Sequence, residues 1–159
     1  MFEIGDKVVY PMHGAGIIEA IEEKEILGEK RNYYVLKMPI GEMKVMVPIN
    51  NVDAVGMRKV INSEEISRVF HILQQDDSPM SNNWNRRYRH NMEKIKTGNI
   101  YELAEVVRNL AARDREKGLS TGEKKMLDSA RQILVSELVL AQDIGEEEAE
   151  DLVDRLAAI

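Results

Sequence analysis

The chain of 159 residues has no cysteine and only 5% aromatic residues. It also lacks any apolar run approaching the roughly 18 residues that a membrane-spanning helix needs. The absence of cysteine excludes disulfides, thiolate metal ligands and a cysteine nucleophile, and it is typical of proteins from a reducing compartment. The first ten residues, MFEIGDKVVY, show no basic stretch followed by an apolar one. We therefore expect neither a membrane span nor a secretory signal.

The sequence is also poor in catalytic patterns. Its three histidines, His13, His71 and His90, form no HExxH or HxH spacing, and no serine stands in a GxSxG motif. The segment His13-Gly14-Ala15-Gly16 lacks the third glycine and the following helix of a phosphate-binding loop. A turn that needs a positive φ explains it better. We predict that the protein is not an enzyme and holds neither a metal nor a cofactor.

The net charge of −6 at first argues against a nucleic-acid partner. However, residues 143–159 alone contain seven acidic side chains and one basic one. Residues 80–98 contain five basic side chains and one acidic one. Because charges are screened over about 8–10 Å in physiological salt, a partner at that segment would respond to its local charge. The acidic C-terminal segment could then lower non-specific DNA affinity, or it could simply be a solvated helix.

The first 55 or so residues have the composition of strands. Proline and glycine punctuate short β-rich runs, which we place at Asp6–Tyr10, Gly16–Ile26, Asn32–Met38 and Glu42–Pro48. Short strands in so small a unit favour a closed barrel, because closure removes exposed edges. We predict an α+β protein, with a small β-barrel over residues 1–58 followed by a compact all-helical domain of about five helices over residues 59–159.

The helices are indicated by their caps. Asn62 with Glu65, Asn99 with Glu102 and Ser120 with Glu123 each have the spacing of a capping box. A further helix is expected from about Trp84 to Gly98, and a last acidic helix after Gly145.

The segment NNWNRRYRH, residues 82–90, is the most unusual one. It contains the only tryptophan of the chain together with three arginines and a tyrosine. On a helix, Trp84, Tyr88, Met92 and Ile95 fall within an arc of about 80°, as residues of a core-facing stripe do. Alternatively, the arginines bind phosphates while an exposed aromatic ring stacks on a base or wedges into a base step. Both interpretations hold if Trp84 overhangs the core and the rest of the stripe is buried.

Two lysines, Lys124 and Lys125, follow the cap at Ser120. Basic residues in a first helical turn oppose the helix dipole. Either a nearby anion compensates for this, or the two side chains are simply solvated.

Four motifs in the same order resemble the CarD/CdnL family of bacterial transcription regulators. They are GDKVVYPMHGAG, YYVLKMPIGEMKVMVP, NWNRRYRHNMEKIKTG and LSTGEKKMLDSARQILVSEL. The resemblance covers nearly the whole chain except its last 17 or so residues. The N-terminal part is also similar to the polymerase-interacting module of transcription-repair coupling factors.

This resemblance implies a Tudor-like barrel that binds the β subunit of RNA polymerase and a helical domain at the upstream edge of the promoter bubble. It implies that Trp84 wedges into the minor groove and stabilises the open complex. The other DNA contacts would come from basic side chains: Arg86, Arg87, Arg89 and Lys124, with Lys125 as a plausible addition.

On the barrel, Lys24 matches one basic polymerase contact of the family. The second falls at Met46, where relatives often have arginine, so either Met46 packs against the partner or Lys44 supplies the charge. Such a regulator needs no cofactor, no small-molecule substrate and no membrane. It would act in the cytoplasm, associated with the nucleoid through RNA polymerase. The alternative is an adaptor that binds proteins through both domains and does not touch DNA.

Overall fold

The computed structural model describes the whole chain, residues 1–159. Its N-terminal part is a five-stranded antiparallel sheet in the order β4-β3-β2-β1-β5. The strands are β1 (Lys7–Tyr10), β2 (Gly14–Ile26), β3 (Glu29–Lys37), β4 (Lys44–Pro48) and β5 (Arg58–Lys59). The four predicted strands are therefore confirmed, and β5 is additional. No ladder joins β4 to β5, so the Tudor-like barrel is a strongly bent sheet whose edges are not hydrogen-bonded to each other.

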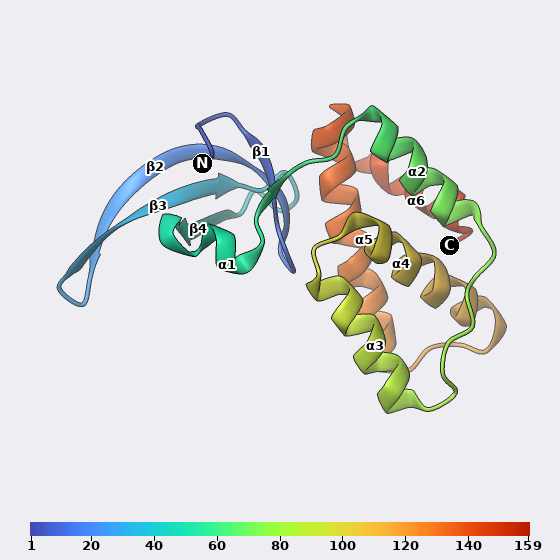
Figure 1. Cartoon of the computed structure of the whole chain (residues 1–159). Helices are drawn as coiled ribbons and strands as arrows, with labels where there is room; N and C mark the ends of the chain where they lie inside the picture. Colours follow the sequence, from blue (N-terminus) through green and yellow to red (C-terminus); the bar gives the residue numbers. More distant parts are fainter.

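The hairpin of β2 and β3 is long and curved, and its tip points away from the helices (Figure 1). A β-bulge between Ile18 and Ala20 shifts the alternation of side chains along β2. Before the bulge, Ile18 lies opposite Leu36 in the sheet's core, and after it Ala20 lies opposite Val35. The core of the sheet consists of seven buried residues: Val8, Ile18, Tyr34, Leu36, Met38, Val47 and Met57.

A short helical turn returns the chain from β4 to β5. It comprises the 3-10 helix η1 (Ile49–Asn51) and helix α1 (Val52–Val55), which ends at Gly56 with a φ of 74°. The sequence did not predict this turn. Strand β5 ends at Lys59, one residue beyond the predicted boundary between residues 58 and 59.

The C-terminal part consists of five helices, as predicted. They are α2 (Ser63–Gln74), α3 (Trp84–Lys96), α4 (Ile100–Glu116), α5 (Thr121–Gln142) and α6 (Glu146–Ala157). The side chains of Asn62, Asn99 and Ser120 accept hydrogen bonds from the first turns of α2, α4 and α5, so all three predicted caps are confirmed. No helix combines the length and the apolar character that a membrane crossing requires.

Helix α5 lies between the sheet and the other helices (Figure 1). The acidic helix α6 is more than a solvated tail, because its Ala149, Val153 and Ala157 belong to the main helical core. Its Asp154 also accepts two hydrogen bonds from Arg131 of α5, of 2.6 and 2.8 Å. Deletion of residues 143–159 would therefore expose the core as well as remove negative charge.

Candidate nucleic-acid interface

Trp84 is the first residue of α3, and its indole ring is held on two sides. The ring stacks on Tyr88 with centroids 5.1 Å apart and an angle of 19° between the planes. The indole Nε1–H donates to the hydroxyl of Ser120, the cap of α5, at 2.9 Å. Even so, Trp84 keeps 43% of its surface exposed. The tryptophan is thus fixed in direction while part of its ring stays open to solvent.

Gly122 seats this aromatic pair against the start of α5. A Cβ atom at Gly122 would lie 3.6 Å from the Trp84 ring and 3.7 Å from the Tyr88 ring. Both distances are those of ordinary van der Waals contact, so α5 packs closely against the two rings at Gly122. The first turns of α3 and α5 therefore meet at Trp84, and the positive ends of both helix dipoles face the same edge.

Beneath Trp84 lies a buried ion pair between Arg87 and Glu123. The guanidinium donates to both carboxylate oxygens, at 2.7 and 3.0 Å, and also to the Ser81 carbonyl at 3.0 Å. The residues are only 4% and 1% exposed. The hydrogen bond from Arg87 lowers the pKa of the Glu123 carboxyl, and the same bond raises the pKa of Arg87. Both groups stay charged at neutral pH.

The burial of Arg87 bears on its predicted DNA contact, which stays a prediction. The N–H groups of Arg87 already donate to Glu123 and Ser81, and Glu123 neutralises the charge of Arg87 inside the helical domain. Arg87 also lines a cleft together with Arg86 and Arg89, and a phosphate there would compete with these partners. The pair holds α3 to α5, and Ser120 links it to Trp84 because the Ser120 hydroxyl also donates to Glu123 at 3.2 Å.

The other predicted DNA contacts are accessible. Arg86 and Arg89 on α3 and Lys124 and Lys125 on α5 are all exposed, and none of the four takes part in an ion pair. The first turn of α3 contains no acidic residue. Arg86 and Arg89 also line a cleft of about 420 Å³ between α3 and the segment around Met80.

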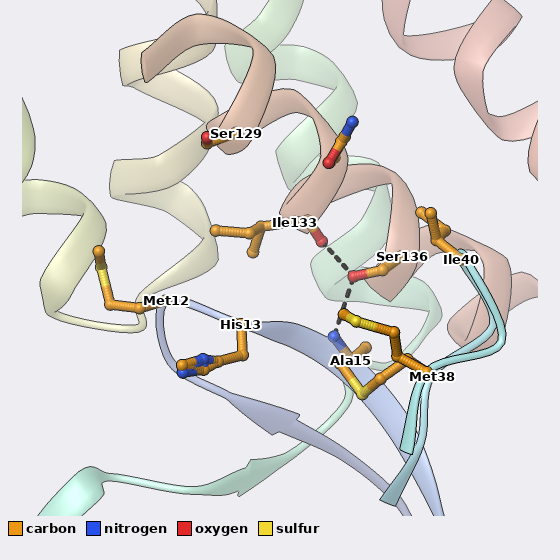
Figure 2. A pocket seen from close by; sticks show the side chains of 10 residues that line it. Met12, His13, Ala15, Met38, Ile40, Ser129, Ile133 and Ser136 are labelled. Carbon is orange, nitrogen blue, oxygen red and sulfur yellow. Dashed lines mark hydrogen bonds between the residues drawn. The ribbon is translucent and has the colours of Figure 1, made fainter. Parts of the chain in front are cut away.

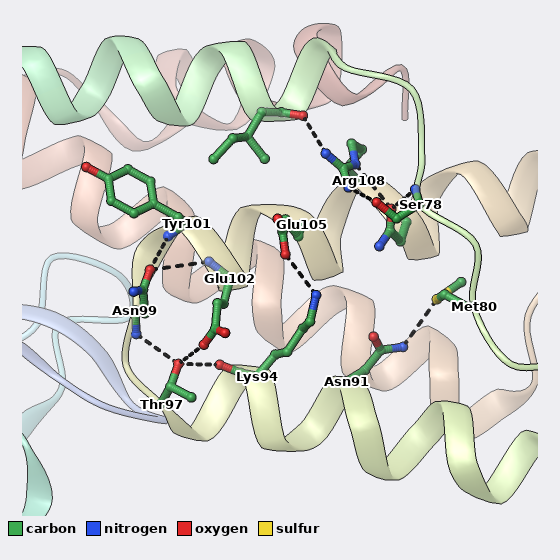
Figure 3. Close-up of polar contacts among 12 residues, drawn as sticks. Ser78, Met80, Asn91, Lys94, Thr97, Asn99, Tyr101, Glu102, Glu105 and Arg108 are labelled. Atoms are coloured by element: carbon green, nitrogen blue, oxygen red, sulfur yellow. Dashed lines mark hydrogen bonds and ion pairs between the residues drawn. The ribbon is translucent and has the colours of Figure 1, made fainter.

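The polar segment that leads into α3 is anchored on α4. Arg108, which is 5% exposed, donates to the carbonyl of Ile72 and to the hydroxyl of Ser78. Farther along α3, the Lys94 ammonium donates to the Glu105 carboxylate of α4 at 2.8 Å. Figure 3 shows this contact together with those of Arg108. The polar segment before α3 is therefore fixed on α4, and this fixes the position of the first turn of α3.

The three residues predicted to bind polymerase lie on one face of the sheet. After the bulge, Lys24 pairs with Arg31, while Met46 pairs with Val35 and Lys44 with Lys37. Arg31, Val35 and Lys37 alternate along β3, so their side chains and those of their partners share a face. This is the face opposite the sheet's core. Lys44 forms an exposed ion pair of 3.1 Å with Glu19, and Met46 is half-buried.

Two family models together match most of the chain. The family model described as CarD-like/TRCF RID domain matches residues 2–61, and the model described as CarD, C-terminal domain matches residues 68–154. A putative transcription factor, YdeB, of Bacillus subtilis (strain 168) is 49% identical over 148 residues, which are 93% of this chain and 97% of the relative.

The chain belongs to the CarD family. It is a transcription regulator whose N-terminal part is an RNA-polymerase-interacting domain.

Two solved structures from Myxococcus xanthus resemble the N-terminal part. The N-terminal domain of CarD is 37% identical with a TM-score of 0.33, and covers 37% of this chain and 79% of its own. The structure titled CdnLNt is 40% identical with a TM-score of 0.33, and covers 38% and 86%.

Sequence reasoning missed the residues that orient Trp84. Ser120 and Glu123 were identified only as a capping pair, and Gly122 only as part of the motif around Lys124. The residues that bond between α3 and α5 lie 36 positions apart in the sequence, so no local sequence pattern indicates that they meet.

Proposed function

We propose that the sheet docks on the β subunit of RNA polymerase, and that the helical domain contacts promoter DNA at the upstream edge of the melted bubble. Trp84 wedges into the minor groove there and stabilises the open complex. The observation that carries this proposal is the fixed and partly exposed indole ring at the meeting point of α3 and α5. The protein would act in the cytoplasm, at the nucleoid through polymerase.

The geometry of Trp84 suits a wedge. Apolar side chains that insert between base steps offset the cost of unstacking, which is a few kcal/mol per step. A side chain that is already held loses little conformational freedom on binding. Trp84 is held by the stack on Tyr88 and by the bond to Ser120. Because the indole N–H already has a partner, we expect the wedge to act by shape rather than by reading a base.

The surrounding cations suit the DNA backbone. Arg86, Arg89, Lys124 and Lys125 are exposed and unpaired, so each is free to neutralise a phosphate. Such contacts carry no sequence information. We therefore expect weak, salt-sensitive binding to free DNA with little sequence preference.

Polymerase docking would rest on Lys24, Lys44 and Met46. The Lys44–Glu19 pair is exposed, and pairs of this kind are worth at most about 1 kcal/mol, so Lys44 can exchange its partner for an acidic group on polymerase. Met46 offers an apolar contact in place of an ionic one, because thioether side chains adapt to irregular surfaces. Docking then raises the local concentration of the helical domain at the promoter.

The wedge shifts an equilibrium without any chemical step. A ligand that binds the open promoter better than the closed one favours the open state by its difference in affinity. A difference of about 1.4 kcal/mol would change the ratio of open to closed complexes tenfold.

Footprinting of a polymerase–promoter complex tests the DNA contact. We expect the protein to protect the upstream edge of the bubble, and Trp84→Ala to weaken that protection while polymerase binding is retained. Tyr101→Ala is the matched control, because it removes a half-exposed aromatic ring elsewhere in the same domain, where Tyr101 packs under Arg68. Absence of protection with the unaltered protein would favour the adaptor without DNA contact.

A further inference from the structure

A buried carboxylate joins the two domains. Glu137 of α5 is 1% exposed and faces the sheet. Arg58 of β5 donates to both of its oxygens, at 2.8 and 2.8 Å, and the backbone N–H of Ile61 donates to one of them at 3.0 Å. A two-pronged bond between arginine and carboxylate fixes orientation as well as distance.

Arg58 also reaches the helix that carries Trp84. Its Nε–H donates at 3.0 Å to the carbonyl of Gly98, the residue that turns the chain from α3 into α4. Gly98 has a φ of 72°, and a Cβ atom there would lie 2.9 Å from Pro11 of the loop that follows β1. One side chain therefore connects the sheet, α5 and the end of α3.

The rest of the contact between the domains is equally specific. The backbone N–H of Ala15 donates to the Ser136 hydroxyl at 2.9 Å (Figure 2), and the Lys7 ammonium donates to the Leu140 carbonyl at 2.9 Å. A Cβ atom at Gly14 would lie 2.8 Å from that hydroxyl. Such close polar contacts fit a single arrangement, because sliding the sheet along α5 would leave buried donors without partners.

We propose that Arg58 is the positioning residue that makes the two domains one rigid body. Docking of the sheet on polymerase then sets the direction of α3 and of its tryptophan. The consequence for transcription rests on the function proposed above, whereas the rigidity itself does not. A freely hinged helical domain would still be tethered near the promoter, but it would reach the bubble edge in many orientations. A rigid joint avoids the loss of orientational freedom on binding, because the orientation of the helical domain is already fixed before it contacts DNA.

The first experiment measures rigidity on the protein alone. Since the chain has no cysteine, spin labels can be placed at Lys30→Cys on the hairpin and Glu93→Cys on α3, both at exposed positions. We expect one narrow distance distribution by pulsed electron paramagnetic resonance. Arg58→Gln and, independently, Glu137→Gln should broaden it. Glu137→Gln retains an oxygen that accepts from the Ile61 N–H, so it serves as the second variant if Arg58→Gln does not fold.

Arg131→Gln is the matched control. It also breaks a two-pronged pair of arginine and carboxylate, but that pair joins α5 to α6 within the helical domain. We expect its distance distribution to remain narrow. A broad distribution in the unaltered protein, or an unchanged one in both joint variants, would overturn the proposal.

The second experiment measures function. With Arg58→Gln, binding to polymerase and to free DNA should stay within about twofold of the unaltered protein, while the gain in open-complex lifetime disappears. Arg131→Gln should retain that gain. The positioning role would be overturned if Arg58→Gln broadened the distance distribution but still gave the full gain in open-complex lifetime. If even the unaltered protein gives no gain, the wedge function fails, and the distance measurement still decides whether the joint is rigid.

Discussion

Removal of the buried carboxylate of Glu123 should destabilise the protein strongly. The substitution Glu123→Ala would leave the Arg87 guanidinium, 4% exposed, with the Ser81 carbonyl as its remaining partner. Breaking a buried ion pair by removing one partner costs about 3–5 kcal/mol, because an uncompensated charge stays inside. For a chain of this length each kcal/mol lowers the melting temperature by roughly 2–4 °C, so we expect a fall of about 10 °C.

Thermal unfolding at neutral pH, followed by circular dichroism, measures this loss. The single tryptophan gives a second probe at the site itself, because the change removes the carboxylate that orients Ser120. The double variant Arg87→Met with Glu123→Leu should be more stable than Glu123→Ala, since no charge is left buried. A loss below about 1 kcal/mol for Glu123→Ala, or a double variant that is no more stable than the single one, would refute this reasoning.

Three further predictions concern the same interface. Because the folded pKa of Glu123 is lowered, its stabilising contribution is present above its unfolded pKa of about 4.3 and is lost as the pH falls through the folded value, so acid unfolding curves should be shallower for Glu123→Gln. Ser120→Ala should cost about 1 kcal/mol as a lost helix cap, and it should lower the fluorescence anisotropy of Trp84 because the indole N–H loses its partner; unchanged anisotropy would show that the Tyr88 stack alone holds the ring. Replacement of Lys124 and Lys125 by glutamine should weaken binding to all DNA sequences alike and reduce the log–log slope of affinity against salt by about 0.9 for each phosphate that is no longer neutralised, whereas an unchanged slope would remove these lysines from the interface.

The fold was largely predictable from local signals. Asn62, Asn99 and Ser120 marked helix starts because a cap and its partner lie three residues apart. The short strand β5 and the turn at α1 were missed, since two or four residues carry no period and are fixed by the sheet they return to.

The candidate site was predictable in its composition but not in its assembly. The segment around Trp84 was recognisable because aromatic and basic residues are concentrated there. The burial of Arg87 was not, because Glu123 lies 36 positions away and Arg87 falls outside the stripe that the helical period predicts to face the core. The shared face of Lys24 and Met46 depends on the bulge next to Ile18, which resets the alternation of β2.

The lifetime of the open complex tests the wedge most directly. Preformed complexes of polymerase with one promoter are challenged with a competitor, and their decay is followed without protein, with the unaltered chain and with Trp84→Ala. We predict that the unaltered chain lengthens the half-life, by about tenfold if the wedge contributes about 1.4 kcal/mol. Trp84→Ala should bind polymerase equally well and give the half-life of polymerase alone. A half-life that Trp84→Ala lengthens as much as the unaltered chain does would contradict the wedge.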